Sequence, residues 1–176
     1  MTASRVLYVV GTAAPPVLNL GNLIRLLRAE GWLTCLVLSP TAAGWVDTAE
    51  LEQLTGMPVR SALRQPTEQD PFPPADAVLA APLTFNTVNK WAAGMNDTTA
   101  LGVLNELLGA AVPIVAAPCV KSLLQSHPAY RASVERLTES GVRFLEQSQT
   151  VVRTQDAAVD FDWPSLVAEV QRLRST

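Results

Sequence analysis

Five short apolar runs alternate along this chain with longer segments that have the apolar spacing of helices. Each run is rich in β-branched or small apolar residues and has the length typical of a buried strand. Strands that alternate with helices form a parallel sheet with helices packed on both of its faces. The sequence therefore predicts an α/β fold, with strands at residues 5–11, 33–38, 77–81, 113–117 and 142–145.

Helices are expected between these strands and after the last one. The first has apolar residues at positions 20, 23, 24 and 27 and ends before Gly31, and the last begins at Pro164. The others are expected near residues 45–54, 87–94, 98–108 and 129–139. No internal repeat or linker interrupts this pattern, so residues 1–176 are expected to form a single domain.

Two stretches have neither pattern. Residues 55–74 hold five prolines and mixed charges, which predicts a long surface loop with at most one short strand near Val59. Long loops within compact domains are often functional. Residues 146–162 are polar and are expected to be irregular.

Composition argues against several classes of partner. The formal net charge is −3, with no Lys/Arg cluster longer than a pair, so neither nucleic acid nor an anionic membrane is an expected partner. No apolar run approaches the ~20 residues needed to cross a bilayer. The N-terminal run lacks the form of a signal peptide, so a cytoplasmic protein is expected.

Metal binding is not expected either. The single histidine, His127, excludes most multi-histidine sites, and Cys35 and Cys119 lack the spacing of metal ligands. Both cysteines lie in or beside predicted strands, where a buried free thiol is the ordinary state in a cytoplasmic protein.

Small and polar residues follow the predicted strands. They include the turn Gly11 to Ala14 and the hydroxyls of Ser39 and Thr41. The carboxyl ends of parallel strands lie at one edge of a sheet, where helix N-termini suit phosphate groups. Gly11 stands alone, so the turn is not a Gly-x-Gly-x-x-Gly fingerprint. Ser39 and Thr41 could equally cap the next helix, and both roles can hold at once.

The most distinctive stretch begins at Pro82, which lacks an N–H and is expected to end the third strand. Residues 82–87 read Pro-Leu-Thr-Phe-Asn-Thr and lead into a helix, the part of an α/β unit where ligands usually bind. An Asx turn that merely shapes the loop is the alternative role for Asn86. The continuation reads Lys90-x-Ala92-x-Gly94-x-x-Asp97.

This stretch resembles the Pro-Ala-Ser-Ala-Asn-Thr loop of the flavin-containing cysteine decarboxylases. That family includes phosphopantothenoylcysteine decarboxylase and the lantibiotic-type peptidyl-cysteine decarboxylases. With weaker matches elsewhere, the resemblance covers about three quarters of the chain in the same order of elements. The weaker matches are Gly11 to Ala14, Gly21-Asn22, Ser39 to Thr41, and Ala117-Pro118 to Pro128.

The resemblance implies a flavodoxin-like (Rossmann-like) three-layer sandwich that binds FMN between subunits of a homotrimer, in some members within a dodecamer. Asn86 is the position that orients the flavin and the reacting substrate. The residues implied to hold the phosphate and ribityl chain are Gly11, Thr12, Ala13, Ala14, Ser39 and Thr41. Those implied to line the flavin are Pro82, Thr84, Asn86, Met95 and Asn96.

The chain departs from the family pattern at the position of the catalytic base. Family members carry an active-site histidine on the segment that leads into the third strand. Counting back from Pro82 without gaps places Glu68 at that position. A carboxylate, with an unperturbed pKa of about 4.3, is a weak base unless burial raises that pKa. A solvated loop carboxylate is the other interpretation of Glu68.

Two further departures concern the substrate. The family's Pro-x-Met-Asn stretch, whose asparagine holds the substrate carboxylate, reads here Pro118-Cys119-Val120-Lys121. Lys121 can pair with a carboxylate or a phosphate, or it can be an ordinary surface lysine. The coenzyme A pathway members carry a cysteine in a glycine-rich lid, whereas residues 146–162 contain neither residue type. Phosphopantothenoylcysteine is therefore not the expected substrate.

Two functions are consistent with these residues. The first is an FMN-dependent enzyme that oxidises and decarboxylates a small or peptidyl cysteine-like carboxylate, with Asn86 orienting it, Lys121 holding its carboxylate and Glu68 as base. The second is an FMN-binding carrier, sensor or regulatory subunit without decarboxylase activity, which the missing histidine and asparagine would fit. A prenylated-flavin synthase fits less well, because the first loop lacks a Gly-x-Ser-Gly sequence.

Overall fold

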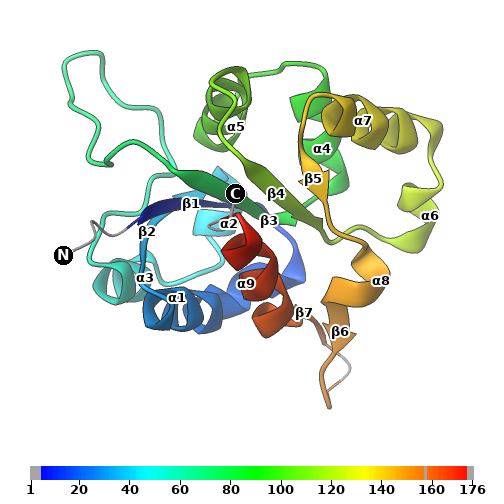
Figure 1. The fold of residues 1–176 in the computed structure, drawn as a ribbon, viewed down its shortest axis with the longest axis horizontal. Coiled ribbons are helices and arrows are strands. Elements are labelled where there is room, and N and C mark those ends of the chain that lie inside the picture. Colours follow the sequence, from blue (N-terminus) through cyan, green and yellow to red (C-terminus); the bar gives the residue numbers. More distant parts are fainter. Residues whose placement is uncertain (1–4, 157, 174–176) are drawn as a thin grey trace.

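The computed structural model describes residues 5–156 and 158–173. Figure 1 shows a twisted sheet between two layers of helices. All neighbouring strands of this sheet are parallel, in the order β2-β1-β3-β4-β5, which is the strand order of flavodoxin-like folds. This confirms the predicted α/β flavodoxin-like sandwich. The strands are β1 (Arg5–Gly11), β2 (Trp32–Leu38), β3 (Ala77–Leu83), β4 (Ile114–Pro118) and β5 (Arg143–Phe144).

Each face of the sheet is covered by its own set of helices (Figure 1). On one face lie the 3-10 turn η1 (Pro15–Asn19), α1 (Leu20–Ala29), α3 (Thr48–Thr55) and α9 (Trp163–Arg172). On the other lie α4 (Phe85–Ala92), α5 (Thr99–Gly109) and α7 (Pro128–Glu139). The short helices are α2 (Pro40–Ala43), α6 (Ser122–Gln125) and α8 (Gln147–Thr150). No described helix is long and apolar enough to span a membrane.

Strand β1 shows why the strands appear as continuous apolar runs. Leu7 and Val9 pack into the core on the α1 and α9 side, whereas Tyr8 and Val10 pack into the core under α4 and α5. Successive side chains of a strand point to opposite faces, so a strand covered on both faces needs apolar residues at every position.

Strand β3 is longer than predicted, since it continues through Pro82 to Leu83. The expectation that Pro82 ends the strand was wrong. The pairing of β3 with β4 shifts register between Ala80 and Leu83, so no ladder hydrogen bond from position 82 is needed there. The carbonyl of Pro82 instead accepts hydrogen bonds from Thr12.

Helix boundaries after β2 and before α5 also differ from the prediction. Two helices, α2 and α3, replace the single one expected at 45–54. Ser39 caps α2, with its Oγ accepting from the N–H of Ala42 at 3.3 Å, and Asp47 caps α3. Ser39 is therefore a helix cap, but of α2 and not of the helix expected at 45–54. Helix α5 begins one residue later than expected, with Thr98 as its cap.

Residues 146–162 are not irregular, as the sequence suggested. They form α8 and an antiparallel hairpin of β6 (Val151–Arg153) and β7 (Val159–Phe161). Each strand has three residues, too few to show a periodic pattern. The carboxylate of Asp160 accepts from Asn19 at 2.9 Å and so attaches the hairpin to η1.

The loop between α3 and β3 is long, as predicted. It contacts the main sheet through a bridge between Arg60 and Val37 and through the carbonyl of Pro73, which accepts from the hydroxyl of Tyr8 at 2.9 Å. Asp70 organises this loop. Its carboxylate pairs with Arg60 at 3.1 Å and Arg64 at 3.2 Å and accepts from the N–H of Phe72 at 3.0 Å. Several charges sharing one partner are worth more than an isolated surface pair.

Asp70→Ala is expected to loosen this loop without unfolding the sheet. Losing the network should cost roughly 0.5–1 kcal/mol of local stability, because the side chains are partly screened by water. Amide hydrogen exchange measured by mass spectrometry should speed up within residues 57–76 and stay unchanged in β1 and β3. Glu139→Ala, which removes an exposed helix carboxylate, is the control and should leave the loop unchanged.

Candidate functional site

Two cavities meet at the carboxyl ends of the strands. The smaller has a volume of about 280 Å³ and the larger about 680 Å³. They share Ala13, Thr84 and Asn86 as lining residues. The larger one has a size typical of small-molecule sites, and the two together suit an elongated ligand. Asn86 therefore lies where the two cavities join.

Thr12 joins the loops that build this junction. Its side chain is 1% exposed, and its Oγ1 donates to the carbonyl of Pro82 at 2.9 Å. The same oxygen accepts from the N–H of Thr84 at 3.0 Å. The hydroxyl supplies the acceptor for the N–H of Thr84, just beyond the end of β3, which would otherwise lack a partner. The carbonyl of Pro82 also accepts from the N–H of Thr12, so the hydroxyl is its second donor.

Gly11 lets the loops approach one another. A Cβ at this position would lie 3.0 Å from Leu38 Cδ2 and 3.4 Å from the carbonyl oxygen of Ala81. The carbonyl of Gly11 accepts from the N–H of Ser39 at 2.9 Å. The absence of a side chain at position 11 thus sets the spacing of three strand ends.

The smaller cavity has the features of a phosphate site. Its polar lining consists of hydroxyls, the amide of Asn86 and one cation, Lys90, and none of its described lining residues is a carboxylate. The N-terminal turn of α5 also lines it, and a helix N-terminus favours anions. Lys90 pairs with Asp97, which is not a lining residue. The hydroxyls are those of Thr12, Ser39, Thr41, Thr84, Thr87 and Thr98.

Three lining residues, Lys90, Thr87 and Thr98, were not predicted from the sequence. Lys90 follows Asn86 by four residues, a spacing that places both on one face of α4. This four-residue spacing is the sequence feature from which Lys90 could have been assigned to the site. Thr98 could not be assigned in this way, because its position depends on how α5 packs beside α4.

The larger cavity has a more apolar wall. Phe85 lines it and is supported from behind by Tyr130, with ring centroids 5.9 Å apart, and by the edge of His127 at 5.6 Å. The Nδ1 of His127 accepts from the N–H of Ala129 at 3.1 Å and so caps α7. The remaining walls come from the first turn, the loop after β4 and the β6–β7 hairpin.

Cys119 lines the larger cavity without being activated. Burial, with a smaller contribution from the charge of Asp160, raises the pKa of its thiol to about 11. The group is therefore a neutral thiol near pH 7 and a poor nucleophile. Both Cys119 and Cys35 are free, as expected. No cluster of three or more metal-ligating side chains occurs among the described residues.

Most of the residues assigned from sequence come together. The smaller cavity contains Thr12, Ala13, Ser39, Thr41, Thr84 and Asn86, and the larger contains Ala13, Ala14, Thr84, Asn86 and Lys121. Gly11 and Pro82 act through their backbones, as described above. Their contacts with a ligand stay predictions.

Besides Gly11 and Pro82, three assigned residues line neither cavity. Met95 and Asn96 form the turn before α5, where the carbonyl of Met95 accepts from Asn105 at 3.0 Å. Glu68 lies in the loop between α3 and β3, which projects from the sheet in Figure 1. Its carboxylate accepts from the N–H of Gln65 at 3.0 Å. A single copy of the chain therefore does not bring Glu68 to Asn86.

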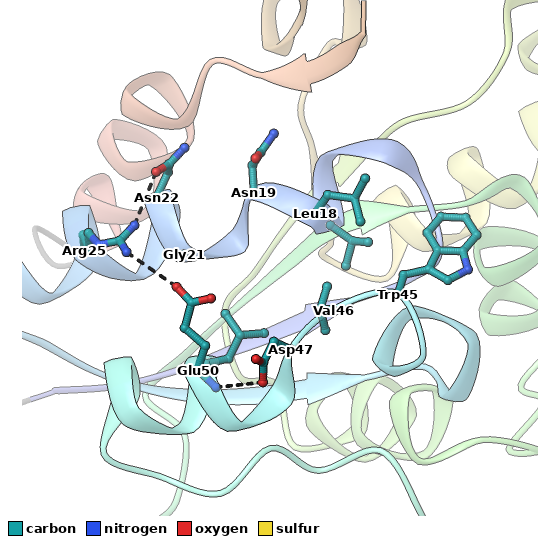
Figure 2. Close-up of a pocket in the computed structure, with 11 residues that line it drawn as sticks. Leu18, Asn19, Gly21, Asn22, Arg25, Trp45, Val46, Asp47 and Glu50 are labelled. Carbon is teal, nitrogen blue, oxygen red and sulfur yellow. Dashed lines mark hydrogen bonds and ion pairs between the residues drawn. The ribbon is translucent and has the colours of Figure 1, made fainter.

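A separate hollow of about 250 Å³ lies between α1 and α3. Figure 2 shows that its charged groups turn toward one another, with Arg25 reaching Glu50 at 3.8 Å and the oxygen of Asn22. Asp47 is occupied in capping α3. These polar groups hold one another in place, and none of the residues assigned to the site from the sequence lines this hollow.

Comparison with known proteins agrees with this geometry. The model of the Flavoprotein family matches residues 1–175. The chain belongs to the Flavoprotein family. This confirms the resemblance that residues 82–97 indicated. A curated relative, the coenzyme A biosynthesis bifunctional protein CoaBC of Thermococcus kodakarensis, is 32% identical over 130 residues, which is 71% of this chain and 32% of that protein. The chain thus spans about a third of the length of this curated relative.

Solved structures of this family have the same fold. The FMN-dependent cysteine decarboxylase TvaF from thioviridamide biosynthesis aligns with a TM-score of 0.76 at 19% identity, over 99% of this chain and 100% of TvaF. EpiD in complex with the substrate peptide DSYTC aligns with a TM-score of 0.76 at 15% identity, over 99% of this chain and 100% of EpiD. A PPC decarboxylase complexed with pantothenoylaminoethenethiol aligns with a TM-score of 0.73 at 19% identity, over 97% of this chain and 98% of that decarboxylase.

Thr12→Val is expected to lower the free energy of unfolding by about 1–3 kcal/mol, because the buried N–H of Thr84 loses its acceptor. Urea unfolding followed by circular dichroism measures this. Thr34→Val is the matched control: the Thr34 side chain is also buried, and its hydroxyl has no hydrogen-bond partner among the described residues. That variant should be neutral or slightly stabilising. Equal losses in both variants would contradict the role given to Thr12.

Proposed function

We propose that this protein is an FMN-dependent enzyme that oxidises and decarboxylates a small or peptidyl cysteine-like carboxylate. The observation that carries the proposal is the position of Asn86 at the junction of a hydroxyl-lined cavity and a larger, more apolar one. This arrangement suits a ligand with a phosphate at one end and a ring system at the other. Two neighbours of the same fold, TvaF and SpaF, are named as FMN-dependent cysteine decarboxylases.

The residues present fit FMN. The phosphate would lie in the smaller cavity, against the hydroxyls and the N-terminal turn of α5. Lys90 adds a positive charge there. When bound, FMN supplies the two-electron oxidation that this protein's side chains cannot perform.

The chain's own residues position the substrate. Asn86 can both donate and accept hydrogen bonds, and it lies where the cofactor and substrate cavities join. Lys121 lines the larger cavity and would pair with the substrate carboxylate as a point charge. Phe85 and Val120 present apolar surface there and so keep water from the reacting carbon.

The first test is the absorbance spectrum of the purified protein before and after denaturation. Flavin bands, with FMN released on denaturation, are expected. Asn86→Ala should keep FMN but lower kcat on peptides with a C-terminal cysteine by about 10²-fold, the usual loss on removing one positioned hydrogen-bond donor. Asn22→Ala, on the exposed face of α1, is the control.

The outcomes separate the candidate functions. A protein that binds FMN but turns over no cysteine-terminated carboxylate would be a flavin carrier, sensor or regulatory subunit. That second function is favoured by one observation, namely that Glu68, the candidate base, lines neither cavity. A colourless protein that also fails to take up added FMN would overturn the cofactor assignment.

We further infer that the protein is a cytoplasmic homo-oligomer, a trimer or a dodecamer, and that Glu68 acts in a neighbouring copy's site. Glu68 shares no cavity with Asn86 in one copy. Its loop is held by Asp70 and carries Leu63, a large apolar side chain that is 77% exposed. An ordered, projecting loop with an exposed leucine is suited to contact between subunits.

Mixing two inactive variants tests this arrangement. Glu68→Gln and Asn86→Ala, unfolded and refolded together in equal amounts, should regain about a quarter of the wild-type rate, because random assembly pairs the two intact residues in that fraction of sites. Each variant refolded alone is the control, and light scattering gives the oligomer mass. Full activity of Glu68→Gln alone would exclude Glu68 as the base.

A further inference from the structure

The short loop after β4 carries Lys121, and hydrogen bonds hold its backbone at each of three successive residues. The N–H of Cys119 donates to the carbonyl of Leu83, at the end of β3, at 2.9 Å. The carbonyl of Lys121 accepts from the N–H of Gln125 at 3.0 Å, within α6. Val120 lies between these two residues and takes its partners from side chains instead.

Gln147, the first residue of α8, bonds both backbone groups of Val120. Its side-chain oxygen accepts from the N–H of Val120 at 2.8 Å, and its side-chain nitrogen donates to the carbonyl of Val120 at 2.7 Å. Gln125 donates to the same carbonyl at 2.8 Å, so the N–H is the group that depends on Gln147. Val120 is 4% exposed, and a buried N–H without an acceptor is costly.

The helix that carries Gln147 is itself attached at both ends. The N–H of Leu145, two residues before Gln147, donates to the carbonyl of Ala116 in β4 at 2.8 Å. The carbonyl of Thr150, the last residue of α8, accepts from the N–H of Asp162 at 2.8 Å. A side-chain amide can accept from an N–H and donate to a carbonyl of one residue at the same time. Gln147 therefore acts toward Val120 as a neighbouring strand would.

The hydrogen bonds of Gln147 bear on Lys121, because Val120 and Lys121 are adjacent in the chain. All three residues line the larger cavity. The ammonium of a lysine is a point charge on a flexible stem, and none of the ion pairs among the described residues involves Lys121. The place that this charge can reach therefore depends on how the backbone of its loop is fixed.

We propose that Gln147 is a positioning residue, which holds Lys121 where it meets the substrate carboxylate in the larger cavity. This rests on the proposed function, in which Lys121 pairs with that carboxylate. Gln147 acts through the backbone of Val120 and contributes no charge of its own. The affinity for a ligand carboxylate should therefore depend on Gln147 only as long as Lys121 is present.

Binding of two unreactive peptides tests the proposal without turnover. The probes are acetyl-Ala-Ala-Ser, in which serine replaces the reactive cysteine, and the same peptide with a C-terminal amide. Titration calorimetry on the FMN-loaded protein should show the free carboxylate binding about tenfold more tightly than the amide, a usual value for one charge-assisted contact. Lys121→Gln should remove this carboxylate preference.

Gln147→Met keeps the length of the side chain and removes its hydrogen bonds. This variant should lower the carboxylate preference to about threefold or less, because the N–H of Val120 loses its acceptor and the loop no longer fixes Lys121. Gln149→Met is the matched control. It makes the same change at an exposed position of α8 outside the cavity, and it should keep the full preference.

Two further measurements separate positioning from general damage to the fold. In the Lys121→Gln background, Gln147→Met should not change the ratio of the two affinities further, whereas two independent effects would add. Amide hydrogen exchange of the protein without peptide, measured by NMR, should become faster at Val120 in Gln147→Met and stay unchanged there in Gln149→Met.

The proposal would be overturned by a wild-type protein without a carboxylate preference, or by a preference that survives Gln147→Met in full. A further loss in the double variant, or unchanged exchange at Val120 in Gln147→Met, would also overturn it. Failure of the proposed function looks different. In that case cysteine-terminated peptides would not be decarboxylated, while the carboxylate preference and its dependence on Gln147 would persist.

Discussion

The hydroxyl of Thr12 is the interaction on which the site depends. It lies at the end of the central strand β1 and is 1% exposed, yet it bonds two backbone groups from the end of β3. Both cavities begin beside it, since Thr12 or its neighbour Ala13 lines each of them. The relative position of the two loops is therefore set from within the core. A site held in this way keeps its shape without a ligand, which lowers the entropy cost of binding.

Around the two cavities, acidic and basic side chains occupy different positions, although the chain is acidic overall. The carboxylates near the site have partners: Asp97 pairs with Lys90, a lining residue of the smaller cavity, and Asp160 accepts from Asn19 and from a backbone N–H. The cavities themselves are lined by hydroxyls, amides and the cations Lys90, Lys121 and Arg153. No described lining residue of either cavity is a carboxylate, although the chain has a formal net charge of −3.

The parts of the site that could be predicted from the sequence are those that directly follow a strand with a clear apolar run. The ends of the buried runs at Gly11, Leu38 and Ala81 were visible, and parallel strands bring the residues after them to one edge. Arg153 could not be found in this way, because β6 is three residues long and reaches the cavity only through the folding of the hairpin. Glu68 was placed by counting along a loop. The number of residues in a loop does not determine where the loop projects.

The departures from the family pattern are better explained by a changed substrate than by a lost activity. Lys121 stands where a neutral asparagine is expected, and Arg153 adds a second charge to the same cavity. The loop that carries Lys121 is held to α8 by two hydrogen bonds of Gln147, both near 2.8 Å. A cavity wall that is ordered in this way and presents Lys121 is consistent with a ligand that carries a negative charge.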